Sequence, residues 1–166
     1  MFARHCQLKG DKIMEERETN IKEDLLGRFP YLNDKVRVQR DRRIYAEIDY
    51  ANFVEVFEYA MQKLNFTFLC TITGLDEGER ISFIYHLTTQ SGIILNLKTS
   101  VPKEKPVLKT IIGYFPGAEI YERELEDLLG VEVEGLPEGK RYPLPDDWPK
   151  DQYPLRKDWK VKCIKS

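Results

Sequence analysis

The chain has 166 residues, of which 42% are apolar, and this suits one globular domain with a well-covered core. Charged residues make up 33%, yet the net charge is only −2. This balance argues against a nucleic-acid binder that works by bulk charge, and it is typical of a thermophilic surface rich in ion pairs. Cys6, Cys70 and Cys163 are far apart, so we expect no disulfide framework, zinc site or iron–sulfur site in this chain.

No stretch of the chain is expected to enter a membrane. The first twenty residues are charged throughout, which argues against a secretory signal. The longest uncharged run, residues 81–97, contains polar side chains and a glycine, so it indicates two strands and a turn. We therefore expect a soluble chain that is held at a membrane only through a partner.

The first predicted elements are a helix and a hairpin. Residues 1–15 have no clear period. Residues 16–29 place apolar side chains at helical spacing, and Pro30 ends the helix. Residues 35–40 and 43–48 alternate as two strands around a tight connection.

The hairpin is basic over residues 35–43. A basic hairpin can bind RNA, so a small RNA- or ligand-binding α+β domain is one alternative function. RNA recognition also needs aromatic rings for stacking, and here only Tyr45 supplies one. A solvated sheet face is therefore favoured.

The strongest amphipathic helix follows Asp49, a plausible N-cap. Its stripe consists of Phe53, Val56, Phe57, Ala60, Met61 and Leu64. An aromatic and methionine stripe at this spacing is nearly always core.

Three strands are predicted next, at residues 66–73, 81–87 and 93–97. Their short connections imply antiparallel neighbours. Cys70 lies among apolar strand residues and is expected to be a buried small hydrophobe. His86 has no companion at ligand spacing, so we interpret it as a surface or hydrogen-bonded residue rather than a catalytic one.

A short helix over 107–114 and an acidic helix between Gly117 and Gly130 complete the order. In the acidic helix, helical spacing predicts one face made of Ala118, Tyr121, Leu125, Leu128 and Leu129, and another made of Glu119, Glu122, Arg123 and Glu126. The simpler interpretation is an amphipathic helix over a core. The alternative is a helix that also offers its charges to a partner. The element order predicts an α+β domain, residues 1–130, with helices on one face of a mostly antiparallel sheet.

Residues 131–166 form a different region, rich in proline and aromatic residues, which we expect to be extended. A disordered tail has few aromatic side chains, so this region needs a surface to lie on. Its own domain can supply that surface. A partner protein fits better, because both tryptophans, Trp148 and Trp159, lie here and tryptophan is enriched at interface anchor points.

Several collinear blocks between Tyr121 and Trp159 resemble the signature of the C subunit of respiratory complex I, a family with relatives in energy-converting membrane-bound hydrogenases. The blocks are Tyr121-Glu122-Arg123-Glu124, Asp127-Leu128-Leu129-Gly130-Val131, Glu134-Gly135-Leu136-Pro137, Arg141, Leu144-Pro145-Asp146-Asp147-Trp148 and Pro154-Leu155-Arg156-Lys157-Asp158-Trp159.

The resemblance implies a non-catalytic subunit of a peripheral arm, on the cytoplasmic side of the membrane. A protein of this kind holds no cofactor and packs on a large subunit related to nickel–iron hydrogenases, with iron–sulfur clusters in partner subunits. The family usually has tyrosine where this chain has Glu126, and phenylalanine where it has Leu129. It also has a Gly-His-Pro triplet, and Leu136 stands here in place of that histidine. These departures look more like the hydrogenase-related or ferredoxin-driven archaeal branch than the quinone-reducing branch, and they argue against a proton-relay role for this block.

The resemblance also predicts a set of partner-binding residues. They are Tyr121, Glu122, Arg123, Glu124, Asp127, Arg141, Trp148, Pro154, Leu155, Arg156 and Trp159. For Arg123, Arg141 and Arg156, guanidinium groups suit bidentate, partly buried contacts, and we expect a carboxylate in a desolvated setting to hold Arg123.

A stand-alone enzyme that uses carboxylates of the acidic helix is a further alternative. General acid–base chemistry needs two carboxylates in one cleft with separated pKa values. On a helix, Glu124 points away from Glu122 and Glu126, and nothing in the sequence desolvates them. We therefore expect no catalytic residue in this chain.

Overall fold

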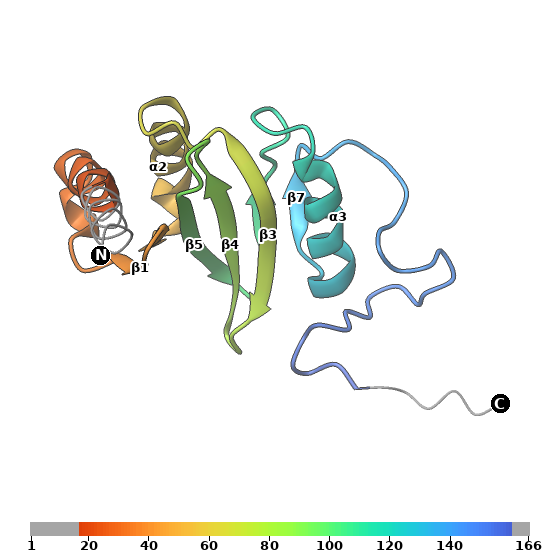
Figure 1. Ribbon diagram of the computed structural model, residues 1–166. Coiled ribbons are helices and arrows are strands. Elements are labelled where there is room, and N and C mark those ends of the chain that lie inside the picture. Colours follow the sequence, from red (N-terminus) through yellow and green to blue (C-terminus); the bar gives the residue numbers. More distant parts are fainter. Residues whose placement is uncertain (1–16, 161–166) are drawn as a thin grey trace, which may run out of the picture. The chain divides into compact units, whose positions relative to one another are not determined.

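The structure is a computed structural model, and it describes residues 17–160 (Figure 1). The chain forms two compact units. The first contains the residues up to 70 together with 84–99, and the second contains 71–83 together with the residues from 100 onward. Residues 1–15, which had no predicted element, lie outside the described part.

A five-stranded sheet has the order β1-β2-β5-β4-β3. Its strands are β1 (Val36–Arg40), β2 (Arg43–Glu47), β3 (Phe68–Asp76), β4 (Arg80–Thr88) and β5 (Ile94–Pro102). The predicted hairpin is confirmed, because β1 and β2 pair antiparallel. The consecutive strands β3, β4 and β5 are neighbours joined by short connections, which makes them antiparallel.

The pairing of β2 with β5 is parallel and was not predicted. Ala46 pairs with Leu97 in the middle of this pair. The chain needs a long crossover to return in the same direction, and that crossover contains α2 (Tyr50–Gln62) together with β3 and β4. The sheet is thus mixed but mostly antiparallel, and the predicted α+β class is confirmed.

The core of the first unit is built as the apolar spacing predicts. Residues 17–28 are helical, and Leu25 is fully buried. Helix α2 covers one face of β4 and β5 in Figure 1 and buries Phe53 and Phe57 against Tyr85, with ring centroids 4.6 and 5.9 Å away. A 3-10 turn, η1 (Pro30–Leu32), follows the first helical segment, where proline ends the regular helix.

Strand β3 departs from its predicted burial. Ile72 is buried as alternation requires, but Phe68 is 53% exposed and Cys70 is also exposed, so the prediction of a buried cysteine was wrong. The physical reason is position in the sheet: β3 is an edge strand, and alternation alone does not reveal which strand lacks a neighbour. In β4, by contrast, the predicted inner face of Ile81, Phe83, Tyr85 and Leu87 is fully confirmed.

The second unit contains α3 (Ala118–Leu129) and a small parallel sheet of β6 (Val107–Lys109) and β7 (Glu132–Glu134). The predicted helix over 107–114 was wrong, because its first residues instead pair with β7. The Thr110 hydroxyl then accepts a hydrogen bond from the backbone of Ile112, a turn that competes with helix.

The boundaries of α3 agree with the glycine signals. The helix begins after Gly117 and ends at Gly130, which has the left-handed φ of 65° that favours glycine at a helix end. Within residues 17–160, no helix has the length and apolar character that crossing a bilayer requires.

Candidate partner-binding surface

The faces of α3 differ from the predicted ones. Leu125 and Leu129 are buried as expected, whereas Tyr121 and Leu128 are only half-buried. Glu122, predicted to face outward, is 1% exposed. The helix is covered on more than one side because β7 lies beside it, as Figure 1 shows. Helical spacing of apolar residues predicts a single buried face, so it could not indicate that β7 buries a second side of the helix.

Glu122 ties α3 to the end of β6. One carboxylate oxygen accepts the Thr110 hydroxyl at 2.6 Å, and the other accepts the backbone N–H of Ile111 at 2.7 Å. Burial raises the pKa of Glu122, and these two hydrogen bonds oppose that rise. The expectation that nothing desolvates this acid was wrong. Because protein donors already occupy both of its oxygens, the contacts support a structural role rather than acid–base work.

The other acids of α3 have separate environments. Burial raises the pKa of Glu126, and a hydrogen bond from the backbone N–H of Val133 opposes the rise. Glu124 is half-exposed and lines a hollow of about 210 Å³ that Leu155 also lines.

Arg123 contacts the C-terminal segment, defined here as residues 131–160. Its Nε and Nη2 donate to one oxygen of Glu119 at 3.1 and 2.8 Å, and Nη2 also donates to the carbonyl of Pro137 at 2.8 Å. The Arg123 side chain is 12% exposed, but that of Glu119 is 49% exposed. A carboxylate does hold Arg123, as expected, but only the guanidinium side of the pair is desolvated.

The segment passes very close to this arginine. A Cβ atom added at Gly139 would collide with the Arg123 guanidinium. A larger residue at position 139 would therefore have to displace the Arg123 guanidinium from its place between α3 and the segment.

Arg141 holds the next part of the segment. Its Nε donates to Asp127 at 2.8 Å, and its Nη1 donates to the carbonyl of Trp148 at 2.9 Å. The second oxygen of Asp127 accepts the backbone N–H of Leu144 at 3.2 Å. Asp127, buried near the end of α3, thus organises a bend in the segment.

Arg156 binds the end of α3. Its Nε donates to the carbonyl of Leu129 at 2.6 Å and its Nη2 to the carbonyl of Gly130 at 3.3 Å. These carbonyls lie at the negative end of the helix dipole, where a cation is stabilising. The guanidinium also lies 4.8 Å from the ring centroid of Tyr153, and that ring packs so closely on Gly130 that any Cβ there would collide with it.

Asp76, at the end of β3, binds the last part of the segment and was missed by the sequence analysis. It accepts hydrogen bonds at 2.8 Å from Lys103 Nζ and from the backbone N–H groups of Gly78 and Lys157. Burial alone would raise the pKa of Asp76, but these donors outweigh it and hold the pKa at about 2. The Asp-x-Gly pattern of residues 76–78 is typical of a turn, and it could have indicated the hydrogen bond from Gly78 but not those from Lys103 and Lys157.

The two tryptophans form a pair. Their ring centroids are 6.2 Å apart, and both indole N–H groups donate to Gln152, at 2.9 Å from Trp148 and 3.5 Å from Trp159. Both tryptophans are half-buried, and Leu155, in the same part of the segment, is 54% exposed. The polar atoms of the pair are therefore satisfied inside the chain, and part of each side chain remains open to solvent.

The structure brings most of the predicted residues into one network within the second unit. Arg123, Asp127, Arg141 and Arg156 join α3 to the C-terminal segment, and Leu155 adds a backbone hydrogen bond of 3.0 Å to Leu128. Tyr121 and Pro154 are half-buried. The chain's own unit supplies part of the surface on which residues 131–160 lie. The partner-binding role of the segment, and of 131–166 as a separate region, stays a prediction.

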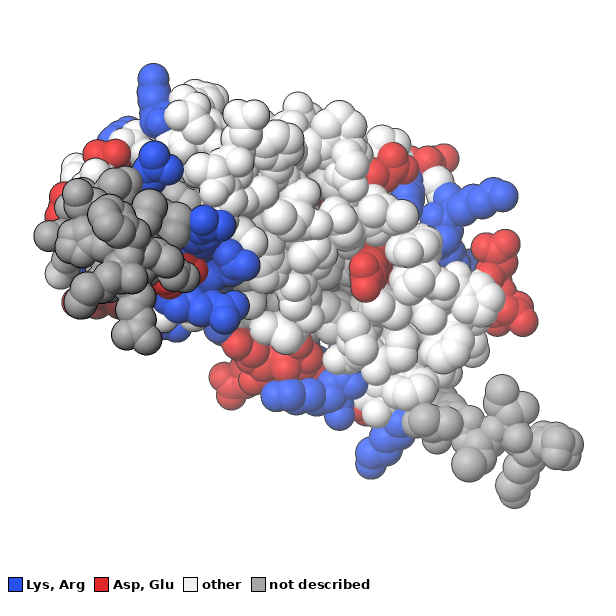
Figure 2. All heavy atoms as spheres, viewed as in Figure 1, with Lys and Arg blue, Asp and Glu red and all other residues white. Residues whose placement is uncertain are grey.

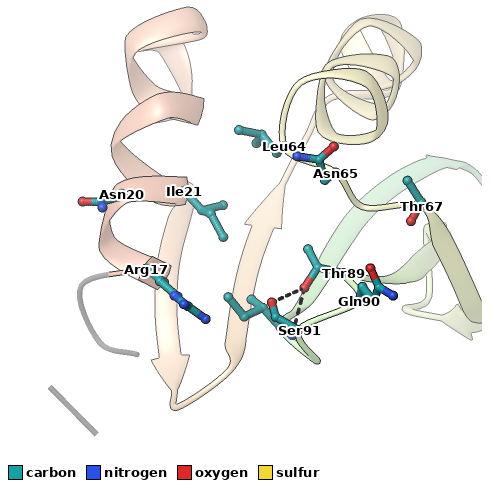
Figure 3. Close-up of a pocket in the computed structure, with 10 residues that line it drawn as sticks. Arg17, Asn20, Ile21, Leu64, Asn65, Thr67, Thr89, Gln90 and Ser91 are labelled. Carbon is teal, nitrogen blue, oxygen red and sulfur yellow. Dashed lines mark hydrogen bonds between the residues drawn. The ribbon is translucent and has the colours of Figure 1, made fainter. Parts of the chain in front are cut away.

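The first unit has a separate hollow of about 810 Å³, between the helical residues 17–28, the end of α2 and the β4–β5 turn (Figure 3). Seven of its ten lining residues are polar or charged, and within the β4–β5 turn the Thr89 hydroxyl lies 2.9 Å from that of Ser91. No residue of the predicted partner-binding set lies there.

The basic hairpin offers little for RNA. Lysines and arginines do gather on one part of the surface (Figure 2). However, the guanidinium of Arg37 lies 4.4 Å from the ring centroid of Tyr45 and occupies the aromatic face that a base would need. Among residues 17–160, no group of three or more histidine, cysteine, aspartate or glutamate side chains could hold a metal ion.

Comparison with known proteins finds relatives that are subunits of oxidoreductase complexes. The C subunit of the F420H2 dehydrogenase of Methanosarcina mazei is 33% identical over 142 residues, which are 84% of this chain and 89% of that one. The C/D subunit of the NADH-quinone oxidoreductase of Phocaeicola vulgatus is 40% identical over 96 residues, which are 55% of this chain but 18% of that one.

Structural comparison agrees with these relatives. A chain in the structure of the membrane-bound sulfane sulfur reductase, an archaeal respiratory membrane complex, has a TM-score of 0.76 and 28% identity, covering 86% of this chain and 85% of that one. Residues 46–164 match the family described as the 30 kDa subunit of respiratory-chain NADH dehydrogenase. The chain therefore belongs to the family of the 30 kDa subunit, also called the C subunit, of complex I-like respiratory enzymes.

Proposed function

We propose that this chain is a non-catalytic scaffold subunit in the peripheral arm of a membrane-bound, complex I-like oxidoreductase, and that it packs on the large subunit related to nickel–iron hydrogenases. One observation carries the proposal. The Phocaeicola vulgatus relative is named as a joint C/D subunit, and the match occupies only 18% of it. A C subunit joined covalently to a D subunit supports a position of the two within reach of each other in the assembly.

The C-terminal segment is the proposed contact, with Trp148 and Trp159 as anchors. Their indole N–H groups already have partners in Gln152, so covering the rings leaves no polar atom unsatisfied. Leu155 adds an exposed apolar side chain in the same part of the segment. Partly exposed aromatic residues on a preorganised support lose little entropy on binding, which is what an anchor requires.

In this proposal the chain itself carries no cofactor, and electrons move through iron–sulfur clusters of partner subunits during ion translocation. It lies on the cytoplasmic side of the membrane and reaches the membrane only through the complex. An assignment to the hydrogenase-related or ferredoxin-driven archaeal branch is part of the proposal, and the archaeal respiratory membrane complex among the structural neighbours supports its archaeal side.

Co-purification of the tagged full chain with the co-expressed large subunit of its own complex tests the proposal. We expect a stable pair, and we expect Trp148→Ala with Trp159→Ala to weaken it at least about tenfold while the pair still forms with Tyr31→Ala. Tyr31 is a matched control because it is an aromatic side chain, 47% exposed, in the first unit. A chain that never co-purifies with the large subunit would overturn the proposal.

A further inference from the structure

A groove in the second unit lies beside α3, outside the tryptophan pair. Its volume is about 520 Å³. It is lined by Pro116, Gly117, Glu119, Ile120, Arg123, Lys140, Arg141 and Tyr142. Ile120 is 45% and Tyr142 is 44% exposed, so two large apolar side chains in this groove face solvent.

Two of the three positive side chains that line the groove form ion pairs, and among the described residues the third does not. Glu119 pairs with Arg123 and Asp127 pairs with Arg141, at 2.8 Å in both cases. Lys140 is exposed, and within residues 17–160 it has neither an ion pair nor a side-chain hydrogen bond. After pairing, the groove keeps one positive charge beside its apolar residues.

Hydrogen-bond donors also remain. The bonds of Arg141 use Nε and Nη1, and those of Arg123 use Nε and Nη2. In the described part of the chain, Nη2 of Arg141 and Nη1 of Arg123 have no acceptor. A guanidinium held rigidly by its other donors presents the remaining N–H groups at little entropic cost.

We propose that this groove receives a segment of the large subunit that carries an apolar side chain next to a carboxylate. The apolar side chain packs against Ile120 and Tyr142, and the carboxylate binds Lys140 and the remaining guanidinium N–H groups. This proposal rests on the proposed function, since it names a second contact between the same two subunits. Arg123 and Arg141 then have two roles: they hold the C-terminal segment on α3, and they shape one wall of the groove.

Two substitutions test the groove in the co-purified pair, with affinity measured by titrating the full chain against the large subunit. Ile120→Lys places a charge in the apolar part, and Lys140→Glu reverses the unpaired charge. We expect each to weaken binding about tenfold or more, and added salt to weaken the parent more than Lys140→Gln. Val54→Lys is the matched control, because Val54 is also an apolar residue, 41% exposed, on a helix of the first unit.

The outcomes separate this proposal from the proposed function. If the parent chain binds and the tryptophan variants do not, but Ile120→Lys and Lys140→Glu bind like the parent, the groove proposal is overturned and the scaffold role stands. If Val54→Lys weakens binding as much as Ile120→Lys, added positive charge explains the loss, and the groove proposal is also overturned. If the parent does not bind the large subunit, the proposed function fails. Melting of each variant alone distinguishes lost contact from lost folding.

Discussion

Two buried carboxylates, those of Asp76 and Glu122, connect separate parts of the second unit through hydrogen bonds. Asp76 accepts three hydrogen bonds from residues that are far apart in the chain, and Glu122 accepts two. A buried carboxylate is tolerated only when its oxygens are bonded, and removing its donors costs more than the bonds contribute. The two acids differ in the sign of their pKa shifts: the pKa of Glu122 is raised by burial, whereas donors hold that of Asp76 at about 2.

Asp76 should make stability depend on pH in the acid range. Its folded pKa of about 2 lies below the ordinary 3.8, so its contribution is present above pH 3.8 and is lost as the pH falls towards 2. The difference corresponds to about 2 kcal/mol. We expect Asp76→Asn to lower the free energy of unfolding by about this amount at neutral pH and to flatten its acid dependence, as measured by urea denaturation across the range.

Asp158→Asn is the control for this prediction. Asp158 contacts the same Lys103, at 2.9 Å, but its side chain is 68% exposed. Solvent screens an exposed pair, so this change should affect stability much less. Equal effects of the two substitutions would contradict the role given to Asp76.

At the scale of elements, α3 and β3 approach closely because of one glycine. A Cβ atom at Gly74 would lie 2.6 Å from a terminal carbon of Leu125 and would collide with Leu129. Both leucines are buried on the inner face of α3. The same helix then carries Glu122 towards β6 and Asp127 towards the C-terminal segment, so its position fixes both contacts.

Gly74→Ala should therefore move or strain α3. We expect a loss of about 1–3 kcal/mol in the free energy of unfolding, the usual cost of overpacking a filled core. Gly27→Ala is the control, since nothing lies within 4 Å of a Cβ there and alanine favours a helix. Denaturant unfolding of both variants checks this, and a Gly74→Ala protein as stable as the parent would show that α3 packs more loosely than the contacts indicate.

At the scale of the whole molecule, the chain is two compact units with different chemistry. The first unit has the basic hairpin and the polar hollow of Figure 3, and the second has the arginine network, the tryptophan pair and the groove. The second unit contains all the predicted partner-binding residues. This distribution is why the proposed contacts with the large subunit are placed there.

We expect the full chain, purified without its partners, to contain no stoichiometric iron, zinc or flavin. Within residues 17–160 no metal-ligating group of three exists, and Cys70 is a single exposed thiol. Metal analysis and visible absorption after gel filtration check this, with an iron–sulfur partner subunit measured in parallel as the positive control. A chromophore that stays with the chain at stoichiometric iron would contradict the expectation.

Local pattern by itself determined a large part of this protein. Apolar spacing predicted α2 and the inner face of β4, and glycine placed both ends of α3, because each signal depends on neighbours a few residues away. The collinear blocks from Tyr121 to Trp159 also indicated the family, which the match over residues 46–164 confirms.

Only the tertiary structure decided which residues are covered. Cys70 is exposed because β3 is an edge strand, residues 107–109 are a strand because β7 pairs with them, and Glu122 is buried because β6 and β7 lie against its helix. The partners of Arg141 and Arg156 likewise come from residues 14 and 27 positions away. Burial and hydrogen bonding at such distances depend on how elements pack, and the period of a single element carries no information about its neighbours in space.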